Sequence, residues 1–367
     1  MKKIDFIVPE GHYFNIGNET FLIEEHTLNE ITRIGLITNK LMSAMQAVIC
    51  TVMNDNLRLT NSHYEIRKIL LSGIHQDHKK ILDKHPKRNS LMTRIDFMID
   101  TNDELRIAEI DPTNKHGLGF ALLCRYETGH GENQKMLTLF SELIEPYNEL
   151  VILIAKNDKF FQKDQEYFAK QLNAYTKKPV SILTEENSVE INEKVKNPLC
   201  CFLDCPVFER TEVNKSLVDL FVEFPKRFLV PPKHWMGNKA IMSFVHEPAF
   251  LKIISSFLSD EDILLLQKYI PKTYTINPLS NKFIVKKVLS SGAKGVFFNG
   301  NAPTKDVIYQ EFIKQKKFIL EGNEQHVRLA AHFVGVKLAE LTVTSSKNLP
   351  VHGGSESINF HVGLKSK

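Results

Sequence analysis

The chain has 367 residues, of which 43% are hydrophobic and 25% are charged. That composition supplies enough apolar material for ordinary globular cores and excludes a disordered or fibrous protein. With 47 basic and 43 acidic residues the net charge is +4, too small over this length to indicate a nucleic-acid or membrane partner. The five cysteines, an odd number in a long chain, exclude a secreted disulfide scaffold.

The N-terminus carries no recognisable targeting signal, because Asp5 and Pro9 interrupt any apolar core that a signal peptide would need. No uninterrupted apolar run reaches the roughly 18 residues of a membrane span. The length corresponds to roughly two or three domains, or to one large enzyme of coupled lobes. We expect a soluble, cytoplasmic protein that binds neither nucleic acid nor membrane, and the sequence leaves a homodimer open.

Apolar residues recur at helical spacing from Leu28 to Val48, and proline and glycine are sparse up to about Ser90. Residues 1–90 are therefore predicted as a helical N-terminal region. The stretch Thr93–Asp111 then alternates apolar and polar residues around a central Thr101-Asn102-Asp103, which predicts a β-hairpin within a segment at 91–147.

The predicted hairpin concentrates charge at the end far from its turn. With the turn centred between Asn102 and Asp103, Asp96 lies opposite Glu109, and Arg94 lies opposite Asp111. One face, expected to pack on a core, then carries a single charge, and its members are Ile95, Phe97, Ile99, Arg106, Ala108 and Ile110. The other face is expected to carry Met98 and Ile107 near the turn and the four charged residues at the far end.

Two directly opposed carboxylates repel each other, and a divalent cation is the simplest compensation. Hard oxygen ligands suit Mg²⁺, which keeps positions for water or for substrate phosphates. The alternative is a solvated hairpin face on which Arg94 neutralises its neighbours.

Residues 148–232 are predicted to form a small parallel α/β domain, because short apolar strands alternate with amphipathic helices. The expected strands are Leu150–Ala155, Pro179–Leu183 and Leu199–Leu203. A cluster of Cys200, Cys201 and Cys205 lacks a second ligand pair at zinc spacing, so core cysteines are the better interpretation.

Residues 233–367 begin with a helical stretch through Lys268 and continue as a β-rich section with glycine turns. Within it, Lys286 and Lys287 interrupt an apolar strand that precedes Ser290-Ser291-Gly292-Ala293-Lys294-Gly295. A lysine beside a flexible loop, whose backbone N–H groups can approach closely, is typical of a phosphate clamp. An ordinary solvated edge strand is the alternative.

Two further segments carry weaker signals. Gln310 and Glu311 lie on a short mixed strand that would suit an adenine-binding edge, although an ordinary surface strand has the same pattern. Lys239 follows Gly237-Asn238 at the start of a predicted helix, close to the one tryptophan of the chain.

Taken together and in this order, the segments resemble the circularly permuted ATP-grasp superfamily, which includes glutathionylspermidine synthetase-like amide ligases. Its R-x-D hairpin and following E-x-N are matched by Arg94-Ile95-Asp96 and Glu109-Ile110-Asp111. Its G-N-K is matched by Gly237–Lys239, its lysine–glycine segment by Lys286–Val296, and its Q-E edge by Gln310-Glu311. The likeness spans roughly residues 90 to 345.

The resemblance implies an α/β protein of α+β lobes with a permuted ATP-grasp fold, the small parallel domain and the helical region. It implies an ATP-dependent ligase that joins small-molecule or peptide carboxylates to amines through an acylphosphate. The roles implied are Mg²⁺ ligands for Asp96, Glu109 and Asp111, a catalytic role for Arg94, and ATP contacts for Lys239, Lys286, Ser290, Ser291, Gly292, Gly295, Gln310 and Glu311. Residues 1–90 would then be part of the ATP-grasp/substrate lobe, and 91–147 would form the metal-binding hairpin and flanking segment of the ATP-grasp core. Residues 233–367 would form the ATP-binding lobe.

Two departures from the family pattern keep alternatives open. Asp111 replaces an asparagine, which retains an oxygen ligand but adds negative charge. Lys287 replaces a proline, so either Lys286 or Lys287 could contact phosphate. A nucleotide-binding pseudoenzyme and a phosphotransferase of the same fold are the rival interpretations.

Overall fold

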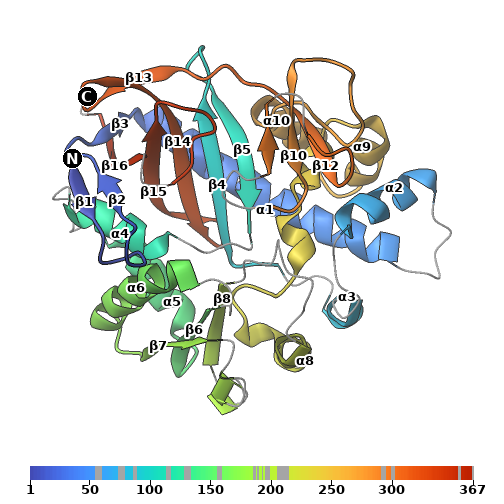
Figure 1. Ribbon diagram of the computed structural model, residues 1–367. Helices are drawn as coiled ribbons and strands as arrows, with labels where there is room; N and C mark the ends of the chain where they lie inside the picture. The colour runs from blue at the N-terminus through green and yellow to red at the C-terminus, as the bar shows by residue number, and fades with distance from the viewer. Residues whose placement is uncertain are drawn as a thin grey trace.

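Three β-sheets and their covering helices give the described part of the chain a mixed α/β architecture (Figure 1). A computed structural model describes residues 1–53, 60–72, 79–85, 89–112, 117–127, 134–154, 159–184, 187, 190–191, 193–194, 199–204, 215–290, 295–298, 302–353 and 357–365. The expected mixed α/β class is thus confirmed.

The largest sheet has nine strands among the described residues, with the main order β1-β2-β16-β15-β14-β4-β5. Strands β13 and β3 add to its edges by pairing with β14 and β16. All pairings are antiparallel except those of β16 with β2 and with β3. The strands are β1 Lys2–Ile4, β2 Phe14–Ile16, β3 Phe21–Ile23, β4 Met92–Ile99, β5 Leu105–Asp111, β13 Lys317–Leu320, β14 Asn323–Val334, β15 Lys337–Ser346 and β16 Ile358–Leu364.

The first 24 residues differ from the predicted helical N-terminal region, because they form strands β1, β2 and β3. Each of these strands has only three residues, too few to show a period of two along the sequence. Strands β2 and β3 both pair with β16, more than 300 residues later, so their conformation depends on a long-range contact.

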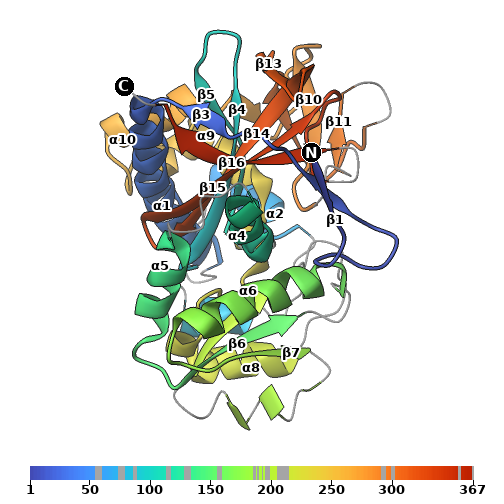
Figure 2. The ribbon, with the colours of Figure 1, turned by 90° about the vertical axis from the view of Figure 1, so that its left-hand side faces the viewer.

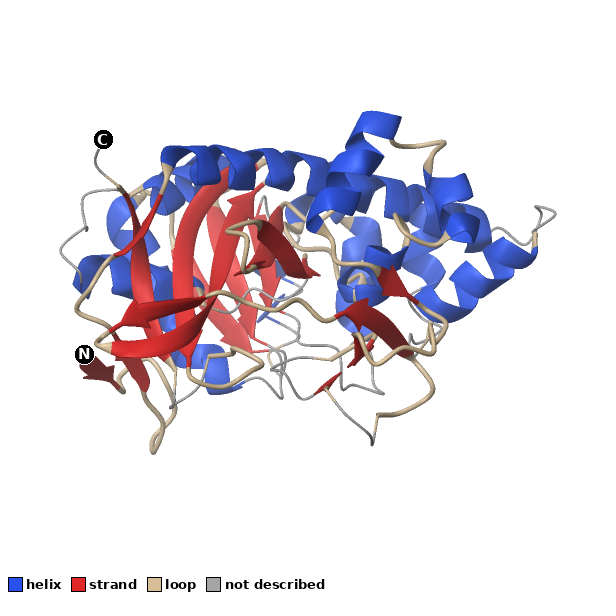
Figure 3. Ribbon diagram, turned by 90° about the horizontal axis from the view of Figure 1, so that it is seen from above, coloured by secondary structure: helices blue, strands red, loops and turns tan. Residues whose placement is uncertain are grey.

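Helix α1 (Glu25–Met53) lies along one face of this sheet (Figure 3). Its buried residues follow the predicted helical spacing, and they join the strands in the largest core of the molecule. A side chain at Gly35 would collide with the ring of Phe333 on β14, so this glycine permits the close approach of helix and sheet. By length and composition alone α1 could cross a membrane, but here its apolar residues are used in the core.

Further helices flank α1, and a four-stranded antiparallel sheet of order β11-β10-β12-β9 lies beside them. Its strands are β9 Thr273–Tyr274, β10 Phe283–Lys287, β11 Val296–Phe297 and β12 Val307–Glu311. The helical elements are α2 Asn61–Leu70, α3 Lys79–Lys84, the 3₁₀ turns η4 His234–Gly237 and η5 Lys239–Ser243, α9 Pro248–Ile254 and α10 Asp260–Tyr269. The predicted helical stretch after Pro232 and the following β-rich section are therefore confirmed.

A three-stranded parallel sheet of order β7-β6-β8 lies below the large sheet, with α4 between them (Figure 2). This confirms the parallel α/β pattern predicted for this part of the chain, while the domain bounds at 91, 148 and 233 stay predictions. The elements here are α4 Leu118–Glu127, α5 Lys135–Ile144, β6 Glu149–Ile154, η2 Lys159–Phe161, α6 Gln162–Tyr175, β7 Val180–Thr184, β8 Leu199–Asp204, α8 Lys215–Glu223 and η3 Pro225–Arg227.

The predicted cysteine cluster falls mostly outside the described residues. Cys205 is not described, and only the backbone of Cys200 and Cys201 is described, within β8. Of the remaining cysteines, Cys124 is buried and Cys50 is half-buried.

The β4–β5 hairpin has the predicted pairing at its charged end and a different one near its turn. Arg94 faces Asp111 and Asp96 faces Glu109, as predicted. Beyond Asp96 the register shifts by one residue, so that Phe97 faces Ile107 and Met98 faces Arg106. Ala108 is the extra residue of this β-bulge.

The bulge overturns the predicted placement of two residues. Ile107, predicted on the charged face, is fully buried in the main core with Phe97. Arg106, predicted on the core face, lies on the opposite side and forms ion pairs with Asp100 and Glu104. A one-residue shift reverses which face each side chain occupies, and the gain is the burial of Ile107 instead of a guanidinium.

Candidate active site

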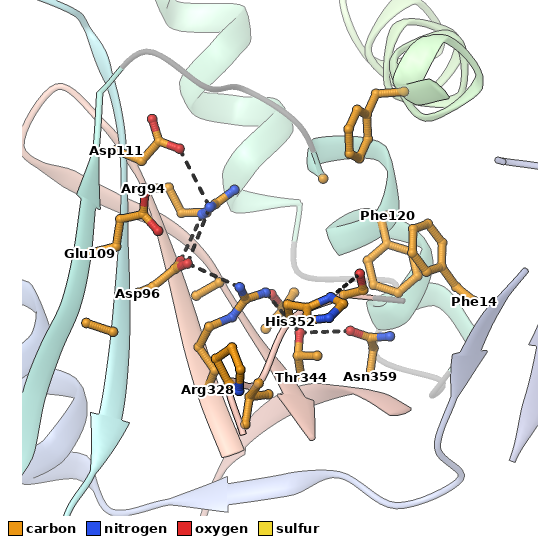
Figure 4. A pocket seen from close by; sticks show the side chains of 18 of the residues that line it. Phe14, Arg94, Asp96, Glu109, Asp111, Phe120, Arg328, Thr344, His352 and Asn359 are labelled. Carbon is orange, nitrogen blue, oxygen red and sulfur yellow. Dashed lines mark hydrogen bonds and ion pairs between the residues drawn. The ribbon is translucent and has the colours of Figure 1, made fainter. Parts of the chain in front are cut away.

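A cavity of about 320 Å³ opens over the face of the large sheet that does not contact α1, and it brings together residues from distant parts of the sequence (Figure 4). The hairpin supplies one wall, and the segment around β10 supplies a second. Seven of the residues predicted for the site line it, namely Arg94, Asp96, Glu109, Asp111, Lys239, Lys286 and Ser290.

Asp96 is the most enclosed of the three carboxylates, at 2% exposed, and lies between two guanidinium groups. Arg94 donates from Nε to Asp96 Oδ1 over 2.8 Å, and its Nη2 lies 3.6 Å from Asp111 Oδ2. Arg328 reaches Asp96 Oδ2 from the neighbouring strand β14, at 3.4 Å. Burial raises the pKa of Asp96, but the charges of Arg94 and Arg328 outweigh it and hold the pKa below its usual range.

Glu109 is the most accessible of the carboxylates, at 29% exposed, and pairs with a lysine from a distant segment. Lys239 Nζ lies 2.9 Å from Glu109 Oε1 and donates to the carbonyl of Ser290 over 2.6 Å. Asn238 caps the 3₁₀ turn that carries this lysine, because its side chain accepts from the Ala240 N–H. The lysine is thereby fixed between the hairpin and the loop that follows β10.

Lys286 and Lys287 are separated by the alternation of strand β10. Lys286 is 7% exposed and lines the cavity, where its Nζ donates to the carbonyl of the bulged Ala108 over 2.9 Å, whereas Lys287 is exposed. Burial lowers the pKa of Lys286 to about 8, although Glu109 favours its charged form. Of the two lysines, Lys286 is the one that can contact a ligand here.

The hairpin end of the cavity gathers more basic than acidic side chains. Four basic groups (Arg94, Lys239, Lys286 and Arg328) face three carboxylates (Asp96, Glu109 and Asp111). The repulsion expected between Asp96 and Glu109 is therefore offset by side chains from other elements, and not by the hairpin's own Arg94 alone. The surplus of positive charge lies at this end of the cavity, since the fourth lining carboxylate, Asp164, belongs to the other end, and it favours a polyanion such as a nucleoside triphosphate.

The donor set also fits Mg²⁺. Among the described residues no group of three His, Cys, Asp or Glu side chains forms a ready-made metal cage. Mg²⁺ does not require one, because it is usually held by one or two carboxylates together with substrate phosphates. Glu109, Asp96 and Asp111 supply such carboxylates on one wall of the cavity.

The other predicted nucleotide contacts lie elsewhere. Gln310 is buried, donates to Thr273 Oγ1 over 3.2 Å and does not line this cavity. Glu311 stands at the end of β12, outside the cavity, and accepts from the Lys272 N–H over 3.4 Å. Gly295 pairs through its carbonyl with the Lys287 N–H, while Ser291 and Gly292 lie outside the described residues.

Sequence reasoning missed the contribution of β14 and β15. Arg328 and His332 line the cavity from β14, and Thr342 and Thr344 line it from β15. The available signal was the even spacing of His326, Arg328 and His332, two and four residues apart within an apolar strand, which places them on one face. Which strand lies beside the hairpin, however, depends on sheet order.

Comparisons with known proteins show a similarity of fold to solved structures, but no similarity of sequence to a known family. No protein-family profile matches the sequence, and no curated protein matches it significantly. Among solved structures, the chain is similar to a glutathione synthetase-like effector from Globodera pallida in apo form, with a TM-score of 0.56, 10% identity, and coverage of 96% of this chain and 90% of that one. A putative gamma-glutamylcysteine synthetase from Methylobacillus flagellatus KT gives a TM-score of 0.43 at 9% identity, covering 82% of this chain and 88% of that one.

Proposed function

We propose that this protein is an ATP-dependent ligase that joins a carboxylate to an amine through an acylphosphate, within a circularly permuted ATP-grasp fold. One observation carries the proposal: Lys239 and Lys286, from segments far along the chain, meet the carboxylate hairpin in a single cavity. The fold shared with a glutathione synthetase-like protein supports it.

The proposed reaction has two steps, formation of an acylphosphate and its capture by an amine. Lys239 and Lys286 hold the phosphates of ATP, and a carboxylate oxygen of the substrate attacks the γ-phosphorus. The new O–P bond gives the acylphosphate, and the bond to the β-phosphate breaks to release ADP. An amine nitrogen then attacks the acyl carbon, loses its proton, and expels phosphate with the C–O bonding electrons.

Arg94 suits the stabilisation of charge in both steps. Asp96 and Asp111 hold its guanidinium in place. Burial lowers the pKa of Arg94, but the neighbouring carboxylates raise it by more, so the guanidinium keeps its positive charge. A cation that is already in position stabilises the negative charge developing in a transition state more than a cation that must first reorganise. Mg²⁺ held by one or two of the carboxylates Glu109, Asp96 and Asp111 would neutralise the phosphate oxygens during transfer.

A hydroxylamine trap tests the proposal without knowledge of the natural amine. Purified protein, ATP, Mg²⁺ and a panel of carboxylic acids should release ADP and form an acyl hydroxamate that mass spectrometry identifies. Variants Lys239→Met and Lys286→Met should lose both products. A protein that binds ATP but releases no ADP with any acid would be a nucleotide-binding pseudoenzyme. ADP release with a stable phosphorylated product, unchanged by added amine, would indicate a phosphotransferase.

A further inference from the structure

The cavity has a second end with a different chemistry. Away from the carboxylates its wall is made of aromatic rings from three separate elements: Phe14 of β2, Phe120 of α4, and Phe160 and Phe161 of η2. We refer to these four residues as the aromatic end. Figure 4 shows Phe14 and Phe120 side by side, on the side of Arg328 opposite to Asp111 and Glu109.

The four rings form two contacting pairs, and all four line the cavity. The Phe14 and Phe120 centroids are 4.5 Å apart, and Phe160 meets Phe161 edge to face at 5.0 Å. Among the described lining residues, Asp164 is the one carboxylate besides Asp96, Glu109 and Asp111 of the hairpin. Its two oxygens accept from the Gly117 and Phe120 N–H groups, over 2.8 and 2.6 Å. This end therefore offers apolar surface without a carboxylate directed at a ligand.

Arg328 stands at the boundary between the two ends. One of its terminal nitrogens reaches Asp96, and the other donates weakly to Thr344 Oγ1 over 3.4 Å. Its Nε is buried and has no hydrogen-bond partner among the described residues. The side chain as a whole lines the cavity and is 22% exposed, so a ligand carboxylate can pair with the guanidinium from the cavity side.

The proposed reaction fixes the direction in which the substrate extends. Its carboxylate must lie beside the γ-phosphate, at the charged end, so the remainder of the molecule points along the β14–β16 face. That direction leads past Arg328 to the rings.

We propose that the acid substrate carries an aromatic ring, which the aromatic end binds, and that Arg328 contacts its carboxylate. This inference rests on the proposed function for the direction of the substrate, while the two binding contacts can be tested without turnover. Burial of a phenyl ring against these residues should strengthen binding by about 10- to 100-fold over the same acid without the ring.

Matched pairs of acids test the proposal: phenylacetate, 3-phenylpropionate and 4-phenylbutyrate against acetate, propionate and butyrate. Calorimetry in the presence of a non-hydrolysable ATP analogue measures binding, and hydroxamate formation measures kcat/KM with hydroxylamine as the common amine. At least one ring-bearing acid should exceed its partner about tenfold or more in both measurements.

Two variants separate the contacts. Phe160→Ala, at a ring that is 37% exposed, should remove most of the preference for ring-bearing acids over their aliphatic partners. Arg328→Gln should weaken both classes. Phe257→Ala, at a ring that is 45% exposed and lies outside this cavity, is the matched control and should change neither.

The outcomes distinguish this inference from the function it rests on. Equal use of aliphatic and ring-bearing acids, or absence of binding by all ring-bearing acids, would overturn the inference and leave the ligase intact. Ring-dependent binding without ADP or hydroxamate would overturn the ligase and keep the binding site. A loss of ATP affinity in Phe160→Ala, with no change toward acids, would show that the rings hold the adenine base and would also overturn the inference.

Discussion

At the scale of single residues, the charged end of the cavity is a network in which each carboxylate is shared with a cation. Asp96 touches Arg94 on its own strand and Arg328 on the next. Glu109 touches Lys239, which belongs to neither strand. Because the carboxylates have different partners, removal of one basic side chain should affect either turnover or ATP binding, and the other quantity can still be measured.

We expect Arg94→Ala to lose turnover by roughly 10²-fold or more, the scale of one oxyanion-stabilising donor. ATP affinity should stay within a few-fold, because Asp96 keeps Arg328 as a partner. Arg94→Lys should rescue poorly, since an ammonium cannot reproduce the planar fork. Single-turnover ADP formation and ATP affinity, measured on the same variant, check this expectation.

The control for Arg94 is Arg106→Ala on the same hairpin. Its guanidinium pairs with Asp100 and Glu104 near the turn and does not line the cavity, so turnover should be unchanged. Unimpaired single-turnover chemistry in Arg94→Ala would leave that arginine a purely structural role.

Lys286 gives ATP binding a predicted pH dependence. Its pKa, lowered by burial to about 8, rises when phosphates bind, because an anion favours the charged form. Binding therefore takes up a proton above pH 8. Affinity should be constant from pH 7 to about 7.5 and should fall, by at most about tenfold per pH unit, as the pH rises from 8 to 9.5. This window lies above the phosphate pKa of about 6.

Calorimetry across that range measures the effect. Lys286→Met should bind ATP more weakly at pH 7 and show a nearly flat profile. Lys287→Met, the exposed neighbour, should behave as the unmodified protein. If Lys287→Met removed the pH dependence and Lys286→Met did not, the phosphate contact would belong to Lys287.

At the scale of secondary structure, the β-bulge in the hairpin serves two purposes. It turns Ile107 into the core and frees the carbonyl of Ala108 for the Lys286 ammonium. Bulges are common where a strand must re-aim side chains next to an active site. The hairpin thus connects core packing to the geometry of the charged cluster.

Ile107→Ala should lower the free energy of unfolding by about 2–5 kcal/mol, because it leaves a cavity in a fully buried site. Met98→Ala, on the opposite face and only half-buried, should cost clearly less. Urea denaturation of both variants gives the comparison. The reverse order would mean that the strands pair without the bulge in solution.

At the scale of the whole molecule, helix α4 joins the polar face of the large sheet to the part of the chain that carries the parallel sheet. Arg125 of α4 holds Glu340 of β15 through two bonds, Nε to Oε2 at 2.7 Å and Nη2 to Oε1 at 2.8 Å. Glu340 is 3% exposed and Arg125 is 12% exposed, so most of this pair is out of contact with solvent. At the other end of α4, Asp164 of α6 accepts from the Gly117 and Phe120 N–H groups.

Arg125→Leu and Glu340→Leu should each cost about 3–5 kcal/mol of stability, because each leaves one buried charge without its partner. The double variant should recover much of that loss, since it removes both charges and retains apolar volume. Unfolding free energies of the four proteins form a double-mutant cycle. Additive costs in the double variant would show that the two residues act independently.

The sequence by itself determined the features that repeat locally. Helix α1 follows from its apolar spacing, and the parallel strands from short apolar runs between helices. The opposition of Asp96 and Glu109 follows from the alternation of the hairpin. Of the twelve site residues predicted from motif resemblance, the structure brings seven to one cavity, namely Arg94, Asp96, Glu109, Asp111, Lys239, Lys286 and Ser290.

Only the tertiary structure decided what depends on contacts between distant segments. Two of the three-residue strands at the N-terminus, β2 and β3, form by pairing with β16. No local sequence pattern predicts such long-range pairing. The bulge at Ala108 places Ile107 rather than Arg106 in the core. The alternation of apolar and polar residues along the strand does not predict this choice. Arg328 and the aromatic rings reach the cavity through sheet order and helix packing. Those are set by the burial of apolar surface across the whole chain, which a short sequence window does not contain.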